Sequence, residues 1–156
     1  VWSHKDKRRH TMHDELSSRL ATLPTGTLAT VLRQKGLNKI WMDTPRAIAP
    51  GQSRVAGRAL TIRFTPARED ITTAASLSGP NSLRALFDQP HAGRILVAST
   101  GGIPNAGVIG DILAARLVMN GITALVTDGV VRDLAAVARS GLPVWSAGSA
   151  ARCGSR

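Results

Sequence analysis

The sequence predicts an α/β fold in which helices cover a central layer of parallel strands. Its second half alternates between short apolar runs and helical stretches in the order β-α-β-α-β, with short connections that favour a parallel sheet. The run at 94–99 (R-I-L-V-A-S) is almost continuously apolar, which is typical of a strand buried on both faces. The segment 58–64 alternates apolar and polar residues, as expected of a half-buried strand.

Glycine, proline and apolar spacing define the elements of the first half. Pro24 separates two stretches in which apolar residues recur at helical spacing. Pro and Gly residues punctuate the segment 44–57, which is therefore predicted to be a loop. The predicted elements are a polar leader or tag at 1–11, helices at 12–23 and 28–36, the loop at 44–57, the strand at 58–64 and a helix at 71–87 that is broken in two at 79–80.

The elements of the second half are bounded mainly by glycine. Gly110 precedes an apolar helical stretch, and Gly121 is the kind of residue that commonly ends a helix. Gly141 ends a second helix in the same way. The predicted elements are a turn at 90–93, strands at 94–99 and 123–127, a helix at 112–120, a turn at 128–129, a helix from 132 or 133 to 140 and a strand from 143. We expect one domain at 12–147 and an irregular tail at 148–156.

Composition and charge argue against several classes of protein. The chain has 156 residues, a formal charge of +10 and a single Cys, so no disulfide framework is indicated. Its basic residues gather near the two ends or are scattered singly, without a basic stripe or interleaved aromatic residues, so we expect no specific nucleic-acid partner. No apolar run reaches the ~18 residues of a membrane span, and no secretory signal is present. We therefore expect a cytoplasmic protein with no membrane partner.

The stretch from Thr100 to Asp133 carries the candidate functional residues. Asp111, Asp128 and Asp133 are the only acids after Asp88, and each lies where a predicted helix starts or a predicted strand stops. Such positions often carry binding and catalytic residues.

Asp111 follows a glycine-rich loop and opens a helix. The glycines, Gly110 among them, would let the backbone approach a ligand closely. The free N–H groups of Asp111, Ile112 and Leu113 would form an anion site. The helix dipole alone also favours an acid at this position, and the sequence leaves both interpretations open. The loop fits neither of the common glycine patterns for nucleotides, which argues against a nucleotide site.

Arg132 and Asp133 come directly after a predicted buried strand and its turn, where ligands collect in open α/β sheets. Arg132 would offer a planar fork to a carboxylate, and Asp133 would offer a hard oxygen to a divalent cation. The alternative is a surface ion pair at a helix start, which contributes little to stability. All four Lys lie in the first quarter of the chain, and His91 is the only histidine after His13. Schiff-base and Ser-His chemistry are therefore not indicated, and metal-assisted chemistry on an anionic substrate remains.

These residues form a pattern that resembles a known family. Twenty residues separate Asp111 from Arg132, in the context G-D-I-L-A-x-R…T-D-G-x-x-R-D…G-L-P-V. This pattern resembles the RraA-like family, which contains regulators of ribonuclease activity and the class II 4-hydroxy-4-methyl-2-oxoglutarate aldolases. The resemblance runs from about Thr27 to Ala147 and includes the segments V-A-G-R-A-L-T-I-R-F and P-A-R-E-D.

The resemblance implies a phosphohistidine-domain-like α/β fold, assembled as homotrimers or hexamers with the site between subunits. It implies that Asp133 binds Mg²⁺ or Mn²⁺ directly, that Arg132 binds the substrate carboxylate and that Asp111 orients a water on the cation. The amides of Ile112 and Leu113 would hold the pyruvoyl end of the substrate. The implied activity is that of a metal-dependent lyase on 2-oxo acids, by retro-aldol cleavage to pyruvate or by oxaloacetate decarboxylation.

Two departures from the family pattern favour an enzyme that is impaired by truncation or a protein without catalysis. The second function considered is therefore that of a non-catalytic regulator that binds a ribonuclease or another macromolecule. Ala136 stands where the family often has an acid, three residues after the metal-binding Asp. Family members also continue well beyond the strand that begins at Pro143, so we expect this chain to be truncated or frame-shifted near Ala151. The missing part would supply final strands and an acid to a neighbouring subunit's site.

Overall fold

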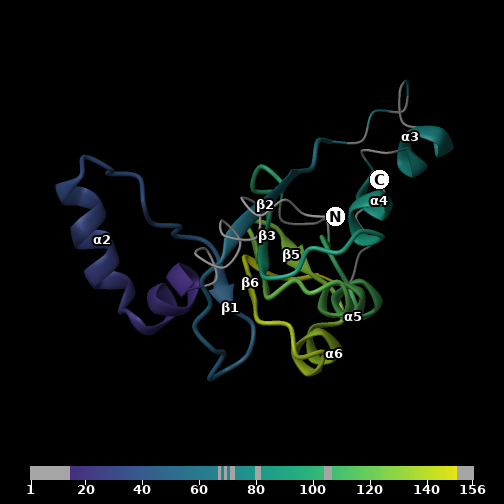
Figure 1. The fold of residues 1–156 in the computed structure, drawn as a ribbon. Coiled ribbons are helices and arrows are strands. Elements are labelled where there is room, and N and C mark those ends of the chain that lie inside the picture. The colour runs from purple at the N-terminus through teal and green to yellow at the C-terminus, as the bar shows by residue number, and fades with distance from the viewer. Residues whose placement is uncertain are drawn as a thin grey trace, which may run out of the picture.

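A five-stranded sheet forms the centre of the computed structural model, which describes residues 15–66, 68, 70, 73–79, 82–103 and 107–150 (Figure 1). The predicted parallel sheet is confirmed, because β2, β3, β4 and β6 run parallel and only β1 joins them antiparallel. In their order across the sheet the strands are β1 (Arg46–Ala47), β6 (Val144–Ser146), β4 (Ala124–Thr127), β3 (Arg94–Ser99) and β2 (Arg58–Arg63).

The helices divide into two groups on opposite sides of this sheet (Figure 1). One group, α4 to α6, packs against the sheet, while α2 and the helical residues 15–22 form an N-terminal arm that extends from the other side. None of the helices in the described residues is both long and apolar enough to span a membrane. The helices are α2 (Thr25–Gln34), α3 (Ala74–Ser78), α4 (Leu83–Phe87), α5 (Asp111–Met119) and α6 (Leu134–Arg139).

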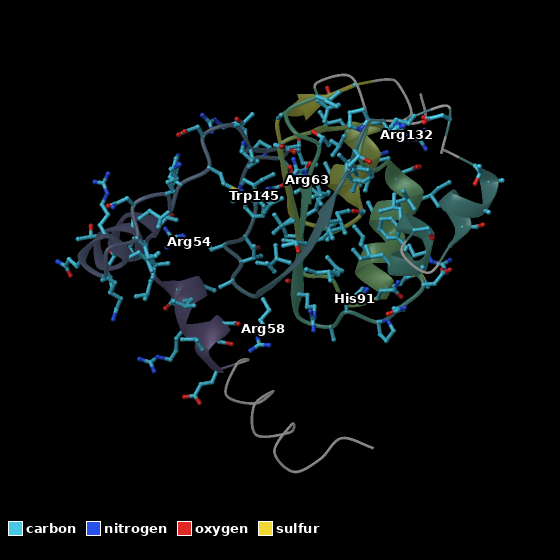
Figure 2. All side chains as sticks on the ribbon, turned by 90° about the horizontal axis from the view of Figure 1, so that it is seen from above. Arg54, Arg58, Arg63, His91, Arg132 and Trp145 are labelled. Carbon is cyan, nitrogen blue, oxygen red and sulfur yellow. The ribbon has the colours of Figure 1, made fainter. Side chains whose placement is uncertain are left out.

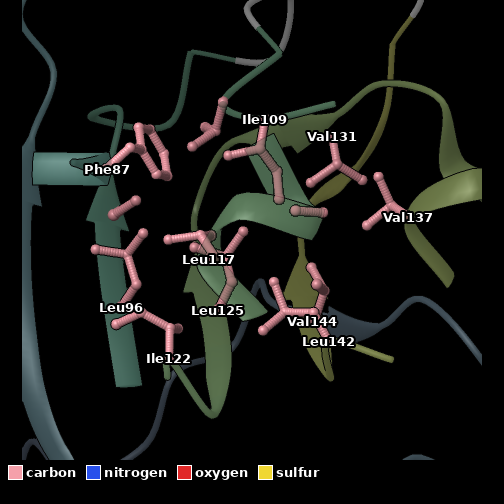
Figure 3. Packing of buried hydrophobic residues seen from close by; sticks show 13 residues of the cluster. Phe87, Leu96, Ile109, Leu117, Ile122, Leu125, Val131, Val137, Leu142 and Val144 are labelled. Carbon is pink, nitrogen blue, oxygen red and sulfur yellow. The ribbon is translucent and has the colours of Figure 1, made fainter. Parts of the chain in front are cut away.

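The hydrophobic core lies between the sheet and the helices α4, α5 and α6 (Figure 3). Leu96 and Leu125 point from the middle strands toward Leu117 of α5, and all three side chains are fully buried. Val137 brings α6 into the same cluster. Burying an aliphatic side chain of this size contributes about 1.5–3 kcal/mol, so this cluster fixes α5 and α6 on the sheet and, with them, the loops that precede each helix.

The opposite face of the sheet is only partly covered. Along β3 the side chains of Leu96 and Ala98 are buried, whereas those of Ile95 and Val97 are half-buried. The prediction that this strand is buried on both faces is therefore wrong. Among the described residues, α4, α5 and α6 pack on one face, and the other face is only partly covered, so that Trp145 on β6 is half-buried there.

Three short strands were not predicted from the sequence. β1 lies within the predicted loop 44–57. Gln52 of the same loop bonds the start of β6 through both ends of its amide, donating to the Val144 carbonyl at 2.9 Å and accepting from the Val144 N–H at 3.2 Å. β5 (Val130–Val131) pairs in parallel with β7 (Gly148–Ser149) in a second, two-stranded sheet. The segment 148–149 is thus a strand, although the sequence predicted an irregular tail there.

The remaining helices and strands agree with the predicted pattern within a few residues. Gly121 ends α5 with φ of +80°, where a side chain would also meet the backbone of Ala92 at 2.8 Å. The predicted two-piece helix is seen as α3 and α4. The predicted leader 1–11 and residues 151–156 lie outside the described residues.

Candidate functional site

Two loops that leave the carboxyl ends of β3 and β4 lie side by side and bring the predicted site residues together. The first loop leads from β3 to the start of α5, and the second leads from β4 through β5 to α6. They are joined by backbone hydrogen bonds from the Val108 N–H to the Val130 carbonyl (2.8 Å) and from the Arg132 N–H to the Ile109 carbonyl (3.0 Å). Because the second bond lies one residue before Gly110, the N-terminus of α5 is held against Arg132 and Asp133.

Gly110 is the point of closest approach between the two loops. A Cβ atom at this position would lie 2.7 Å from Nε of Arg132 and 2.7 Å from Oδ2 of Asp133. The backbone of Gly110 has φ of −122°, which any residue can adopt. Glycine is therefore required here for space rather than for conformation, and it lets both charged side chains lie directly over the start of α5.

Arg132 and Asp133 form a loose ion pair at the mouth of this site. Nε of Arg132 lies 3.5 Å from Oδ2 of Asp133, and the two side chains are 35% and 49% exposed. The contact uses only Nε, and within the described residues the two terminal guanidinium nitrogens make no hydrogen bond. The planar fork of Arg132 thus stays available to a carboxylate ligand.

Asp133 adopts a backbone conformation that is unusual for a residue other than glycine. Its φ of 55° and ψ of 40° lie in the left-handed region, and among the described residues it is the one non-glycine residue with positive φ. Strained backbone of this kind gathers at functional sites. Asp133 precedes α6, yet its carboxylate does not cap the helix. The side chain is instead turned toward Arg132, where it remains half exposed.

Asp111 lies at the first position of α5, beside Gly110. Its Oδ1 accepts a hydrogen bond of 2.8 Å from the N–H of Ile112, so this amide is occupied by the neighbouring side chain. The predicted binding of a ligand by the Ile112 amide therefore requires the Asp111 carboxylate to turn away. Leu113 packs partly against the core, and its N–H, in the first helical turn, has no acceptor within the helix.

Asp128 organises the beginning of the glycine-rich loop. Its carboxylate accepts hydrogen bonds from the N–H groups of Thr100 (2.6 Å) and Gly102 (3.1 Å) and from the hydroxyls of Ser99 (3.1 Å) and Thr100 (3.2 Å). Desolvation by burial raises the pKa of Asp128, but these hydrogen bonds favour the charged form more strongly and leave the pKa below its usual value. Sequence reasoning noted this acid but gave it no role. Its position directly after a buried strand was the available signal.

The side chains of this site include few possible ligands for a divalent cation. No group of three or more His, Cys, Asp or Glu side chains converges in the described part of the chain. Asp133 offers one half-exposed carboxylate in an open position. Mg²⁺ commonly binds through one or two carboxylates and retains several waters. A single accessible carboxylate, that of Asp133, is therefore compatible with Mg²⁺ if water fills the other coordination positions.

Nearly the whole chain matches the model of a single protein family. The RraA-like family model, described as Aldolase/RraA, matches residues 11–156. Two curated proteins that are provisionally named 4-hydroxy-4-methyl-2-oxoglutarate aldolases also match. One, from Pseudomonas fluorescens, is 31% identical over 80 residues, or 51% of this chain and 49% of the relative. The other, from Laribacter hongkongensis, is 32% identical over 95 residues, or 61% of this chain and 56% of the relative.

Solved structures support the same fold. RraAS2 from Streptomyces coelicolor, described as an unusual member of the RNase ES inhibitor RraA protein family, aligns with a TM-score of 0.79 and 30% identity over 91% of this chain and 67% of its own. An uncharacterised protein from Pseudomonas syringae aligns with a TM-score of 0.66 and 26% identity over 87% of this chain and 57% of its own. The chain spans about half the length of the curated relatives that it matches.

Proposed function

Because this chain belongs to the RraA-like family, we propose that it is a divalent-metal-dependent lyase acting on 2-oxo acids. The reactions proposed are retro-aldol cleavage of 4-hydroxy-4-methyl-2-oxoglutarate-type substrates to pyruvate and decarboxylation of oxaloacetate. The observation that carries the proposal is the convergence of Arg132 and Asp133 on Gly110, at the N-terminus of a helix and beyond the carboxyl end of a parallel strand. The aldolase names of the curated relatives agree with it.

Arg132 is proposed to bind the carboxylate of the substrate. Its two terminal nitrogens face no acceptor among the described residues, so a carboxylate can take both in a bidentate pair. The free amide of Leu113 and the positive end of the α5 dipole would stabilise the negative charge that develops on the 2-oxo oxygen as the C–C bond breaks.

Asp133 is proposed to hold Mg²⁺ or Mn²⁺. When bound, the cation would act as a Lewis acid toward the carboxylate and 2-oxo oxygens of the substrate. The loose Nε contact with Arg132 leaves the half-exposed carboxylate of Asp133 uncovered. The cation on Asp133 and the guanidinium of Arg132 would therefore bind the same carboxylate end of the substrate from two adjacent positions.

Asp111 is proposed to orient a water that accepts the proton from the substrate hydroxyl. Its carboxylate lies at the exposed start of α5 and is tied only to the Ile112 N–H within the described residues. If the carboxylate turns toward the substrate, it releases this N–H for the pyruvoyl oxygen. One side-chain rotation would thus serve both proton transfer and charge stabilisation.

The proposed assembly is a homotrimer or hexamer with the site close to a subunit boundary. Arg132 and Asp133 are 35% and 49% exposed in the single chain. Exclusion of water would strengthen their interactions with a charged substrate. A neighbouring copy that covers this site is proposed to provide that exclusion.

The test is pyruvate release from oxaloacetate and from 4-hydroxy-4-methyl-2-oxoglutarate by the purified chain, with and without Mg²⁺. We expect Mg²⁺-dependent turnover of at least one of the two substrates. Absence of turnover of both substrates, at any protein concentration that permits assembly, would contradict the proposal.

A second candidate function is that of a regulator that binds a ribonuclease without catalysis. It is favoured by the 30% identity to a solved member of the RNase ES inhibitor RraA family. It is also favoured by the half-buried Ala136 in the first turn of α6, at a position where the resemblance leads us to expect an acid. Inhibition of a ribonuclease that is unchanged by Asp133→Asn, together with absent lyase turnover, would support this function instead.

A further inference from the structure

Asp128, at the start of the second loop, holds the first turn of the loop that leaves β3. The N–H groups of Thr100 and Gly102 donate to its carboxylate directly. The N–H of Gly101 donates to Oγ of Ser99 at 3.4 Å, and this hydroxyl in turn donates to Asp128 at 3.1 Å. Gly101 and Gly102 have φ of +68° and +76°, which glycine adopts without strain. The first turn of the loop is thus wrapped around one carboxylate.

Gly129 extends this contact toward the proposed site. A Cβ atom at Gly129 would lie 2.6 Å from Cγ2 of Thr100 and 2.8 Å from Cγ2 of Val108, so its backbone packs against the first loop near its start and near its end. Both of these side chains are buried. The carbonyl of the next residue accepts the Val108 N–H, and the two loops stay paired from there to Arg132. Asp128 therefore lies at one end of a continuous series of contacts and Arg132 at the other.

The carboxylate of Asp128 is fully engaged within the chain. Oδ1 accepts from the N–H and the hydroxyl of Thr100, and Oδ2 accepts from Ser99 and Gly102. A carboxylate offers about four lone-pair sites, so these four bonds leave little for a cation or a substrate. Hydrogen bonds to a charged acceptor are also about twice as strong as those between neutral groups. Any role of Asp128 in the site is therefore exerted through the loop.

We propose that Asp128 is a positioning residue of the site, which holds the start of the first loop so that Gly110 meets Arg132 and Asp133 at the correct distance. The hydrophobic core fixes the body of α5, whereas this series of contacts fixes the loop that leads into the helix. The expected effect on turnover rests on the proposed lyase function. The expected effect on the loop does not.

The first measurement compares oxaloacetate turnover by Asp128→Ala with and without formate. Alanine removes a half-buried carboxylate and leaves space for formate, which can accept the same hydrogen bonds. The folded variant should lose at least about tenfold in kcat/KM, because catalytic geometry tolerates little misplacement. Formate should restore part of this loss. Its effect is taken relative to that on the wild-type chain and to chloride at the same ionic strength.

Asp88→Ala is the matched control. Asp88 also bonds another segment of the chain, since it pairs with Arg116 of α5. It lies three residues before His91, and Figure 2 shows His91 and Arg132 at opposite ends of the molecule's sheet. Asp88→Ala should therefore keep the wild-type kcat/KM, and formate should affect it as it affects the wild-type chain.

Amide hydrogen exchange tests the same inference without turnover. The N–H groups of Val108 and Arg132 bridge the two loops, whereas the Leu125 N–H is bonded to the Pro143 carbonyl between β4 and β6. In Asp128→Ala the two bridging amides should exchange at least about tenfold faster, in excess of any change at Leu125, because the loss of charge-assisted hydrogen bonds opens the loop locally. Formate should slow this exchange. Asp128→Asn, which keeps one acceptor oxygen, should show the same selectivity if the alanine variant does not fold.

Equal acceleration at all three amides would overturn the proposal, because Asp128 would then support only the fold as a whole. Unchanged kcat/KM in a folded Asp128→Ala variant would overturn it as well, and so would a loss that formate does not reduce. Absence of turnover by the wild-type chain would contradict the proposed lyase function instead, and hydrogen exchange alone would then decide whether Asp128 positions the loop.

Discussion

Nε of Arg132 lies 3.5 Å from Oδ2 of Asp133, and both atoms would lie 2.7 Å from a side chain at Gly110. The two residues are adjacent in sequence, and the left-handed backbone of Asp133 turns its carboxylate back toward the arginine instead of into the cap of α6. This places a carboxylate and a guanidinium over the same helix N-terminus, where the proposed cation and the substrate carboxylate would bind.

Asp133→Asn should abolish turnover. Asparagine keeps the shape of the side chain and tolerates the left-handed backbone, so the loss would report on the charge and not on the fold. The proposed site has one ligand from the chain, which leaves no other to hold the cation. Pyruvate release should likewise stop after exhaustive EDTA treatment and return with Mg²⁺. Asp43→Asn, outside the proposed site, is the control and should behave as wild type. Activity that survives EDTA would contradict the metal requirement.

Arg132→Lys should lower kcat/KM by roughly 10- to 150-fold, which corresponds to the loss of one charge-assisted hydrogen bond worth about 1.5–3 kcal/mol. An ammonium group keeps the charge but cannot reproduce the planar fork. Steady-state kinetics on oxaloacetate measure the effect, and Arg139→Lys on α6 is the matched control. Near-wild-type kinetics for Arg132→Lys would place this residue outside the site.

Gly110→Ala should impair activity more than stability. The added methyl group would collide with Nε of Arg132 and Oδ2 of Asp133, and these partly exposed side chains can move away at a cost of about 1–3 kcal/mol. Their displacement should reduce kcat/KM by at least about tenfold, because catalytic geometry tolerates little misplacement. Gly26→Ala is the control, since a side chain there meets nothing within 4 Å. A Gly110→Ala variant with full activity would show that the position of Arg132 and Asp133 is not critical.

The proximity of the start of α5 to Arg132 and Asp133 could be predicted from the sequence because adjacent parallel strands end at the same edge of a sheet. The need for glycine at position 110 could not be predicted from the sequence, because it depends on which side chains lie next to that position in the folded chain. β1, β5 and β7 have two residues each, which is too short for a period of two to be recognised. The half-covered face of β3 could not be predicted either. An apolar run indicates that a strand can be buried, but it does not indicate which part of the chain covers each face.

Asp128→Asn should lower the free energy of unfolding at pH 7 by about 1–3 kcal/mol, because an amide nitrogen cannot accept the hydrogen bonds of the Thr100–Gly102 loop. The folded pKa of Asp128 lies below the unfolded one, so its charge stabilises the fold above about pH 4 and this contribution is lost as the pH falls through the lowered pKa. Urea denaturation at pH 7 and pH 3 measures both effects. The difference between wild type and variant should shrink at the lower pH. A difference that does not change with pH would assign the effect to packing.

Asp111→Ala should separate binding from turnover. The Asp111 carboxylate accepts the Ile112 N–H at 2.8 Å, so removing it exposes an amide at the N-terminus of α5. A second free N–H beside that of Leu113 and the loss of a negative charge should both favour an anion at this position. Pyruvate should therefore inhibit the variant at least as strongly as it inhibits wild type. Turnover should nevertheless fall by about 10²–10⁴-fold, which is the usual contribution of a general acid–base group. Parallel measurements of kcat and of the pyruvate inhibition constant distinguish the two effects. If both parameters worsen together, Asp111 acts by supporting the helix start and the proposed exchange between carboxylate and substrate does not occur.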